Sequence, residues 1–171
     1  VANSIIQTAD GGYALSGNTA WDESLNSSPF IAKLNIYGDF IWRKVYDDIK
    51  IYGPITTSII ETKSNQFAVV AKSVILLTDS LGNMLSSTKN PSYNLDTLVE
   101  VYDTTICVAG YELSDSMDLA FGGQVTIPNL EFISTKSGNN PPSGITHSLL
   151  DKNNSFAVCG FMINDSFLAI F

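Results

Sequence analysis

The sequence predicts an all-β protein built from repeated four-stranded antiparallel units. Short apolar runs alternate with turns between Ser4 and Tyr46, at Asp10–Gly12 and at Tyr37–Asp39. Glycine supplies the positive φ that tight hairpin turns require. The same pattern returns later in the chain. Only 15% of the residues are charged, while Asn, Ser and Thr are abundant, as is typical of β proteins with many turns.

Each unit is expected to contain short strands joined by turns. The turn at 79–83 repeats the chemistry of Tyr37–Asp39, and an irregular segment is expected at Gly122–Asn129. The predicted strands, in chain order, are Ser4–Thr8, Tyr13–Asn18, Phe30–Asn35, Phe40–Tyr46, Val74–Thr78, Met84–Thr88, Met117–Phe121, Leu130–Thr135 and Phe167–Phe171.

Four fourteen-residue segments align without a gap and end in a small residue; they are Ser4–Gly17, Ser58–Ala71, Thr97–Gly110 and His147–Gly160. Their ends recur at roughly 40 to 55 residues, which brackets the length of a four-stranded propeller blade. We therefore predict one domain, a partial β-propeller of about three and a half four-stranded antiparallel blades. The blades are expected at about 1–50, 51–94, 95–143 and 144–171.

The last unit has three predicted strands and ends on an apolar one. An unpaired hydrophobic edge strand is avoided in folded proteins. We therefore expect these 171 residues to be a fragment of a larger propeller, or half of a dimer that closes jointly.

Residues 4–46 also carry the pattern I-x-x-T-x-D-G-G-Y…G-x-T…F-x-A-K-L-x-x-x-G-x-x-x-W-x-K-x-Y. This pattern resembles the blade repeat of bacterial and archaeal surface β-propellers. Gly38, four residues before Trp42, is similar to the tryptophan-docking blades of quinoprotein-type propellers. The resemblance implies a secreted or cell-surface protein, and Trp42 on its strand is expected to pack against the next blade.

The charge and the apolar pattern exclude several classes of partner. The net charge is −8 and the pI is about 4.3, and the basic residues do not cluster in the sequence. Nucleic acid is therefore not an expected partner, because its phosphates would be repelled. The sequence contains no apolar run of about 18 residues and no intact signal peptide, so membrane insertion is not expected.

Two cysteines and three acidic residues are candidates for special chemistry. Cys107 and Cys159 are expected to be small buried hydrophobes, with a disulfide left open. Glu112, Asp115 and Asp118 supply three carboxylates within seven residues, which suits calcium; a solvated acidic turn is the alternative. No other cofactor is expected, because a lone His147 with two distant cysteines makes no zinc site.

The candidate ligand-binding residues are Trp21, Asp22 and Glu23, in the long loop 19–29. An aromatic side chain beside two acids suits a sugar or a peptide, and the alternative is an ordinary surface loop. The Asp10–Gly12 segment suits either a hairpin turn or a cation loop. No catalytic residues are predicted, since no G-x-S-x-G elbow accompanies His147.

We therefore predict a non-enzymatic, extracellular or cell-surface propeller module that binds protein or glycan, and this prediction rests on analogy of fold. Its other expected partners are further blades of a longer chain or a second copy. One alternative is part of a propeller enzyme, a hydrolase, lyase or quinoprotein relative with catalytic residues outside this chain. The other is a structural subunit that assembles through open blade edges.

Overall fold

The computed structural model describes residues 1–20, 26–52, 57–102, 104–113, 119–137, 144–150, 156–162 and 165–170. These residues form strands and turns and no helix. Three four-stranded antiparallel sheets and a three-stranded one follow each other along the chain, and two short strands form an additional pair. The predicted all-β class is confirmed. A helix long and apolar enough to span a membrane is not found in the described part of the chain.

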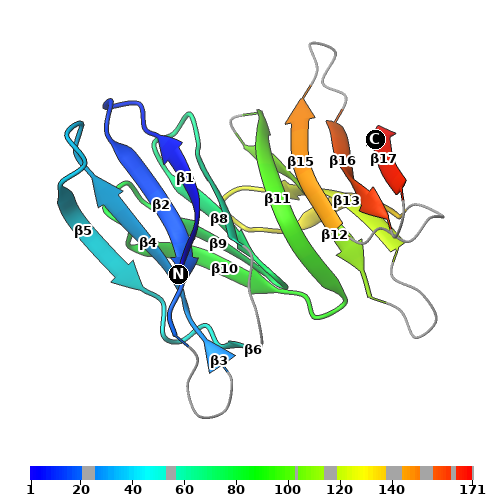
Figure 1. Ribbon diagram of the computed structural model, residues 1–171, viewed down its shortest axis with the longest axis horizontal. Helices are drawn as coiled ribbons and strands as arrows, with labels where there is room; N and C mark the ends of the chain where they lie inside the picture. The colour runs from blue at the N-terminus through cyan, green and yellow to red at the C-terminus, as the bar shows by residue number, and fades with distance from the viewer. Residues whose placement is uncertain are drawn as a thin grey trace.

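Each of the four larger sheets is a meander whose strands lie side by side in the order in which they occur in the chain (Figure 1). The first sheet contains β1 (Ala2–Gln7), β2 (Tyr13–Asn18), β4 (Pro29–Leu34) and β5 (Phe40–Val45); the second contains β7 (Thr57–Glu61), β8 (Phe67–Ala71), β9 (Val74–Thr78) and β10 (Met84–Lys89); the third contains β11 (Tyr93–Tyr102), β12 (Thr105–Glu112), β13 (Leu119–Thr126) and β14 (Phe132–Ser137); the fourth contains β15 (Gly144–Leu150), β16 (Phe156–Met162) and β17 (Asp165–Ile170); and β3 (Asn26–Ser27) pairs with β6 (Ile51–Tyr52).

Two predicted strands, Tyr13–Asn18 and Val74–Thr78, have the same bounds in the structure, and the others in the first two units differ by one or two residues at their ends. The irregular segment predicted at 122–129 was wrong for residues 122–126, which belong to β13, whereas residues 127–129 form the turn that follows this strand. A Cβ on Gly123 would lie only 2.9 Å from ring atoms of Phe121 and Phe132, so the glycine makes room for these rings.

The first turn of the first sheet and the first turn of the second sheet make the same backbone hydrogen bonds, although the second turn lacks glycine. In turn 8–12 the N–H of Thr8 donates to the carbonyl of Gly12 at 2.9 Å, and the N–H of Gly11 donates to the carbonyl of Thr8 at 2.8 Å. Turn 62–66 makes the same two bonds at 2.8 and 2.9 Å. Gly11 in the first turn has φ +83°, and Asn65 takes its place in the second with φ +56°. Asparagine tolerates the left-handed region, so the turn persists without its glycines.

The second hairpins of these two sheets are equivalent, as predicted. In turn 35–39 the side-chain oxygen of Asn35 accepts two backbone N–H groups, and in turn 79–83 the Oδ1 atom of Asp79 does the same. Gly38 and Gly82 hold the same position with φ values of +88° and +73°.

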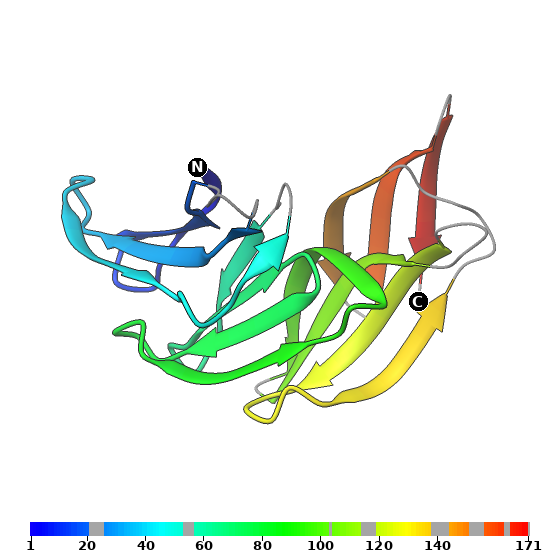
Figure 2. The same ribbon diagram turned by 90° about the horizontal axis from the view of Figure 1, so that it is seen from below.

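Consecutive sheets pack face against face (Figure 2). Along β8, Phe67 and Val69 join a buried cluster with the first sheet, while Ala68 and Val70 join a second cluster with the third sheet. All four are at most 1% exposed. A strand covered on both faces needs no alternation of polar residues, which explains the continuous apolar run. Strand β15 lies against β11 and β12 in turn.

Candidate functional site

The predicted ligand-binding residues Trp21, Asp22 and Glu23 lie outside the described residues. The described ends of their loop are held together by Thr19 and Ser28. The N–H of Thr19 donates to the carbonyl of Ser28 at 2.9 Å, and the N–H of Ser28 donates to the Thr19 hydroxyl at 2.9 Å.

Asp115 and Asp118 of the predicted acidic group also lie outside the described residues. Glu112 is the last residue of β12 and pairs with Tyr93 of β11. Burial, and secondarily the charge of Glu112, raises the pKa of Tyr93. Within the described residues no three His, Cys, Asp or Glu side chains gather as a metal site would require.

The Asp10–Gly12 segment is a hairpin turn, and the cation beside it is the protein's own Lys33. The Nζ atom of Lys33 donates to Asp10 Oδ1 at 2.9 Å, to Thr8 Oγ1 at 2.9 Å and to the carbonyl of Leu34 at 3.2 Å. Hydrogen bonds from Thr8, from Lys33 and from the N–H of Gly12, in that order, lower the pKa of Asp10 to about 2. These bonds favour the charged form of the Asp10 carboxylate, which lines a cleft.

This cleft, of about 450 Å³, lies between the first and second sheets. The turns of both sheets and the strand β5 surround it. Its described lining residues are Ala9, Asp10, Lys33, Ile41, Trp42, Glu61, Asn65, Ser80, Leu81 and the ring of Phe67. They combine an apolar and aromatic wall with carboxylate, amide and hydroxyl groups.

Trp42 builds the wall of the cleft by docking on the second sheet, as predicted. Its ring meets the ring of Phe67 edge-on, with 6.2 Å between centroids. Ring atoms of Trp42 lie 2.8 Å from the position that a Cβ on Gly82 would occupy. Nearby, the hydroxyl of Tyr46 donates to the carbonyl of Gly82 at 3.0 Å, and burial raises the pKa of this phenol. Trp42 is therefore held between two sheets.

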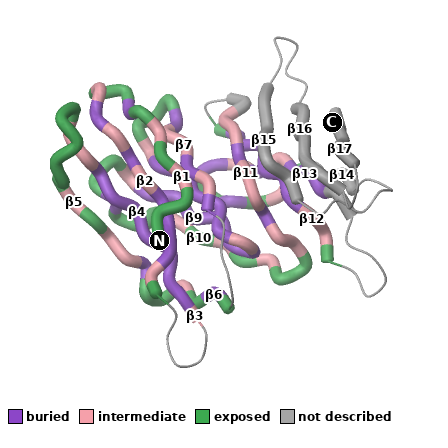
Figure 3. The backbone as a smooth tube through the Cα atoms, in the orientation of Figure 1, coloured by how far each residue is buried: buried purple, intermediate pink, exposed green. Residues whose placement is uncertain are grey.

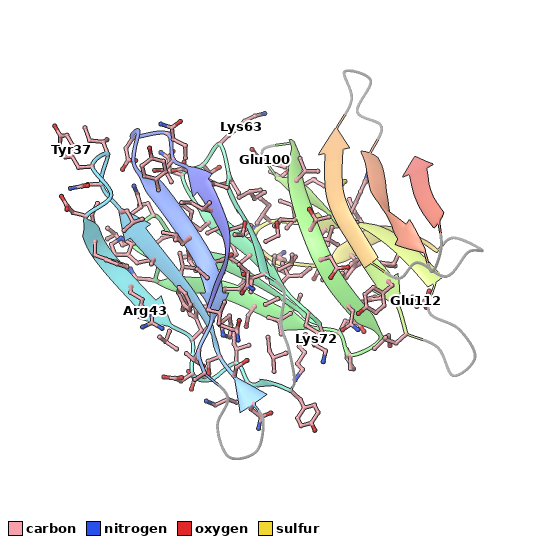
Figure 4. The ribbon with its side chains drawn as sticks, in the orientation of Figure 1. Tyr37, Arg43, Lys63, Lys72, Glu100 and Glu112 are labelled. Atoms are coloured by element: carbon pink, nitrogen blue, oxygen red, sulfur yellow. The ribbon has the colours of Figure 1, made fainter. Side chains whose placement is uncertain are left out.

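Glu61, which also lines the cleft, connects the two sheets. Its Oε2 atom accepts the backbone N–H of Ala9 from the first sheet at 2.7 Å. The next pair of sheets repeats the contact, because the carboxylate of Glu100 accepts the N–H of Lys63 at 3.0 and 3.1 Å (Figure 4). A carboxylate at the end of the first strand of one sheet thus binds the first turn of the preceding sheet.

The described lining residues include no histidine or cysteine, and Lys33 is engaged by Asp10. The described lining offers apolar and aromatic contact together with carboxylate, amide and hydroxyl groups. The prediction missed Lys33 and Glu61. A signal for Lys33 was present, because a charged side chain within the apolar run Pro29–Leu34 needs a hydrogen-bonding or charged partner when it is buried.

Cys107 is buried, as predicted, and its thiol is free; burial raises its pKa to about 11. Cys159 lies in β16, and the side chain of this residue is outside the described part of the structure.

No protein-family model matches the chain, and no curated protein matches it. Among solved structures, the chain is similar to a protein of unknown function from Bacteroides caccae, with a TM-score of 0.65 and 14% identity over 96% of this chain. The chain spans 57% of that protein. It also matches an acylaminoacyl peptidase of Pyrococcus horikoshii with a TM-score of 0.48 and 13% identity, covering 92% of this chain and 30% of the peptidase. The first likeness concerns the fold alone.

Proposed function

We propose that this chain is part of a β-propeller that acts as a secreted or cell-surface binding scaffold for protein or glycan. The main support for a propeller is that equivalent positions of β5 and β10 contact the next sheet along the chain. Trp42 of β5 contacts the turn at Gly82, and Ser86 at the corresponding place in β10 donates to the carbonyl of Pro128 in the third sheet. Together with the carboxylate contacts of Glu61 and Glu100, this supports one unit stacked repeatedly.

The binding role is supported by the cleft between the first two sheets. Apolar side chains that are largely exposed, Ile41 at 57% and Leu81 at 63%, stand beside the carboxylates of Asp10 and Glu61. Such a surface combines an apolar platform with acceptors for hydroxyl or amide N–H groups. Hydrogen-bonded turns hold these groups in place, which lowers the entropy lost when a ligand binds.

An oligosaccharide array and a peptide library, probed with the labelled protein, test this proposal. Replacing Ile41 or Leu81 by Arg fills the cleft entrance with a charged side chain, and we expect such variants to lose the ligands that the unmodified protein captures. Tyr52→Arg is the matched control, because Tyr52 is 62% exposed and does not line the cleft. Ligands captured equally by all three variants, or no reproducible ligand at all, would contradict the proposal.

A further inference from the structure

One face of the first sheet exposes apolar side chains to solvent. The equivalent side chains of the second and third sheets are buried. Ile5 is 59% exposed, whereas Ile59 and Leu98, at the same place in the aligned fourteen-residue segments, are 2% and 4% exposed. Strand β1 accordingly consists of exposed and intermediate residues (Figure 3). Tyr13 and Leu15 on the same face are half-buried. Their counterparts in the second and third sheets are at most 1% exposed, namely Phe67, Val69, Ile106 and Val108.

In the second and third sheets this face is covered by the preceding sheet. Glu61 and Glu100 mark the contact, each accepting an N–H group from the first turn of that preceding sheet. The first sheet has Gln7 at this position, and the residue is exposed. A glutamine amide oxygen accepts a backbone N–H in the same way as a carboxylate. The first sheet therefore retains both the apolar and the polar parts of the contact.

The turn around Gly38 also lacks the contact that its equivalent in the second sheet makes with the preceding sheet. Gly82, its equivalent, lies under the ring of Trp42 from the preceding sheet. A Cβ added to Gly38 would meet no atom within 4 Å, and the adjacent Tyr37 is 83% exposed. In Figure 4, Tyr37 extends from the end of this hairpin.

We propose that this face is an interface for one more four-stranded sheet of the same repeat, carried by the same polypeptide. Its apolar face covers Ile5, its first turn donates an N–H group to Gln7, and its fourth strand places a large side chain over Gly38. The same polypeptide is the expected source, because the faces of the second and third sheets are each covered by the sheet that precedes them in the same chain. The similar fold from Bacteroides caccae likewise belongs to a longer chain, of which the match covers 57%.

The proposal rests on the proposed stacking of repeats and is tested by extending the protein. A second copy of residues 1–56 is placed directly before Asn3, which corresponds to Thr57 in the aligned repeats. A cysteine at Ile5 of the original copy is labelled with a thiol reagent and located by mass spectrometry. We expect its labelling rate to fall about tenfold or more in the extended protein, because docking removes the site from solvent.

Three control cysteines define the scale of the labelling. A cysteine at the Ile5 position of the added copy should stay fast, since that copy now presents the open face. Leu81→Cys should label fast, and Ile59→Cys slowly, with or without the extension.

Equal labelling of both Ile5 positions in the extended protein would overturn the proposal. Proteolysis confined to the added copy would do the same, because a matching sheet would be ordered by this interface. Labelling of the unextended Ile5→Cys protein that slows as its concentration rises would assign the face to a second copy instead. The readout is docking and not ligand capture, so the proposed binding function can fail without affecting this result.

Discussion

Alanine substitutions at Gly82 and Gly38 separate the cost of a strained turn from the cost of disturbing the contact between sheets. The two glycines occupy the same position in turns 79–83 and 35–39, with positive φ in both. Of the two, Gly82 alone has neighbours from another sheet, namely the ring of Trp42 and the flexible side chain of Lys44, whose Cδ atom lies 3.3 Å from an added Cβ. Gly38→Ala therefore serves as a matched control for Gly82→Ala.

The expected magnitudes follow from these two environments. A Cβ in the left-handed region costs about 1–2 kcal/mol, and this cost applies to both positions. At Gly82 the new Cβ would also lie 2.8 Å from Trp42 ring atoms, and overpacking of this kind costs about 1–3 kcal/mol. Gly38→Ala should therefore lower the free energy of unfolding by about 1–2 kcal/mol, and Gly82→Ala by about 2–5 kcal/mol.

Urea unfolding followed by circular dichroism measures both costs and also permits a cycle with Trp42→Ala. Trp42→Ala alone should cost about 2–3 kcal/mol, below the range for a fully buried tryptophan, because Trp42 is half-buried. With alanine at position 42 the overlap disappears, so Gly82→Ala and Gly38→Ala should then cost the same. Equal costs in the unmodified protein, or an excess at Gly82 that survives Trp42→Ala, would refute the reasoning.

Three further predictions concern single groups. The pKa of Asp10 is about 2 in the folded protein and 3.8 for an ordinary aspartate. Its ionised carboxylate therefore stabilises the fold above about pH 4, and this stabilisation is lost as the pH falls toward 2. Because its side chain is 62% exposed, we expect this contribution to be about 1 kcal/mol or less, and Asp10→Asn should flatten the acid limb of urea stability. Glu61→Ala, which leaves the N–H of Ala9 without its acceptor, should lower the unfolding free energy by about 1 kcal/mol, and Glu61→Gln by less. Cys107, buried and with a pKa of about 11, should react with iodoacetamide at pH 8 only as urea unfolds the protein.

Each of these has a clear opposing result. An unchanged acid limb in Asp10→Asn would show that the bonds to Lys33 do not stabilise the folded state. Equal midpoints for the Ala and Gln variants of Glu61 would remove the role of its acceptor atoms. Fast alkylation of Cys107 without urea would contradict its burial.

The strands and turns were predictable because they depend on neighbours in sequence. Turn residues with positive φ and short apolar runs specify Tyr13–Asn18 and Val74–Thr78 locally, and the repeat confirms the pattern elsewhere. The Gly122–Gly123 pair shows the limit of local reasoning. Whether a glycine breaks a strand or makes room for rings depends on Phe121 and Phe132, and Phe132 approaches from the neighbouring strand.

The candidate site was less predictable, because its groups come from different sheets. A candidate calcium site was predicted at Glu112, Asp115 and Asp118, because these acidic residues are close in sequence. The cleft instead joins Asp10 and Lys33 of the first sheet to Glu61 of the second. The repeating strands and their turns follow from the amino-acid order, because they arise from backbone preferences and short-range apolar patterns. The pairing of each carboxylate with its N–H group does not, because it depends on how one sheet packs on the next.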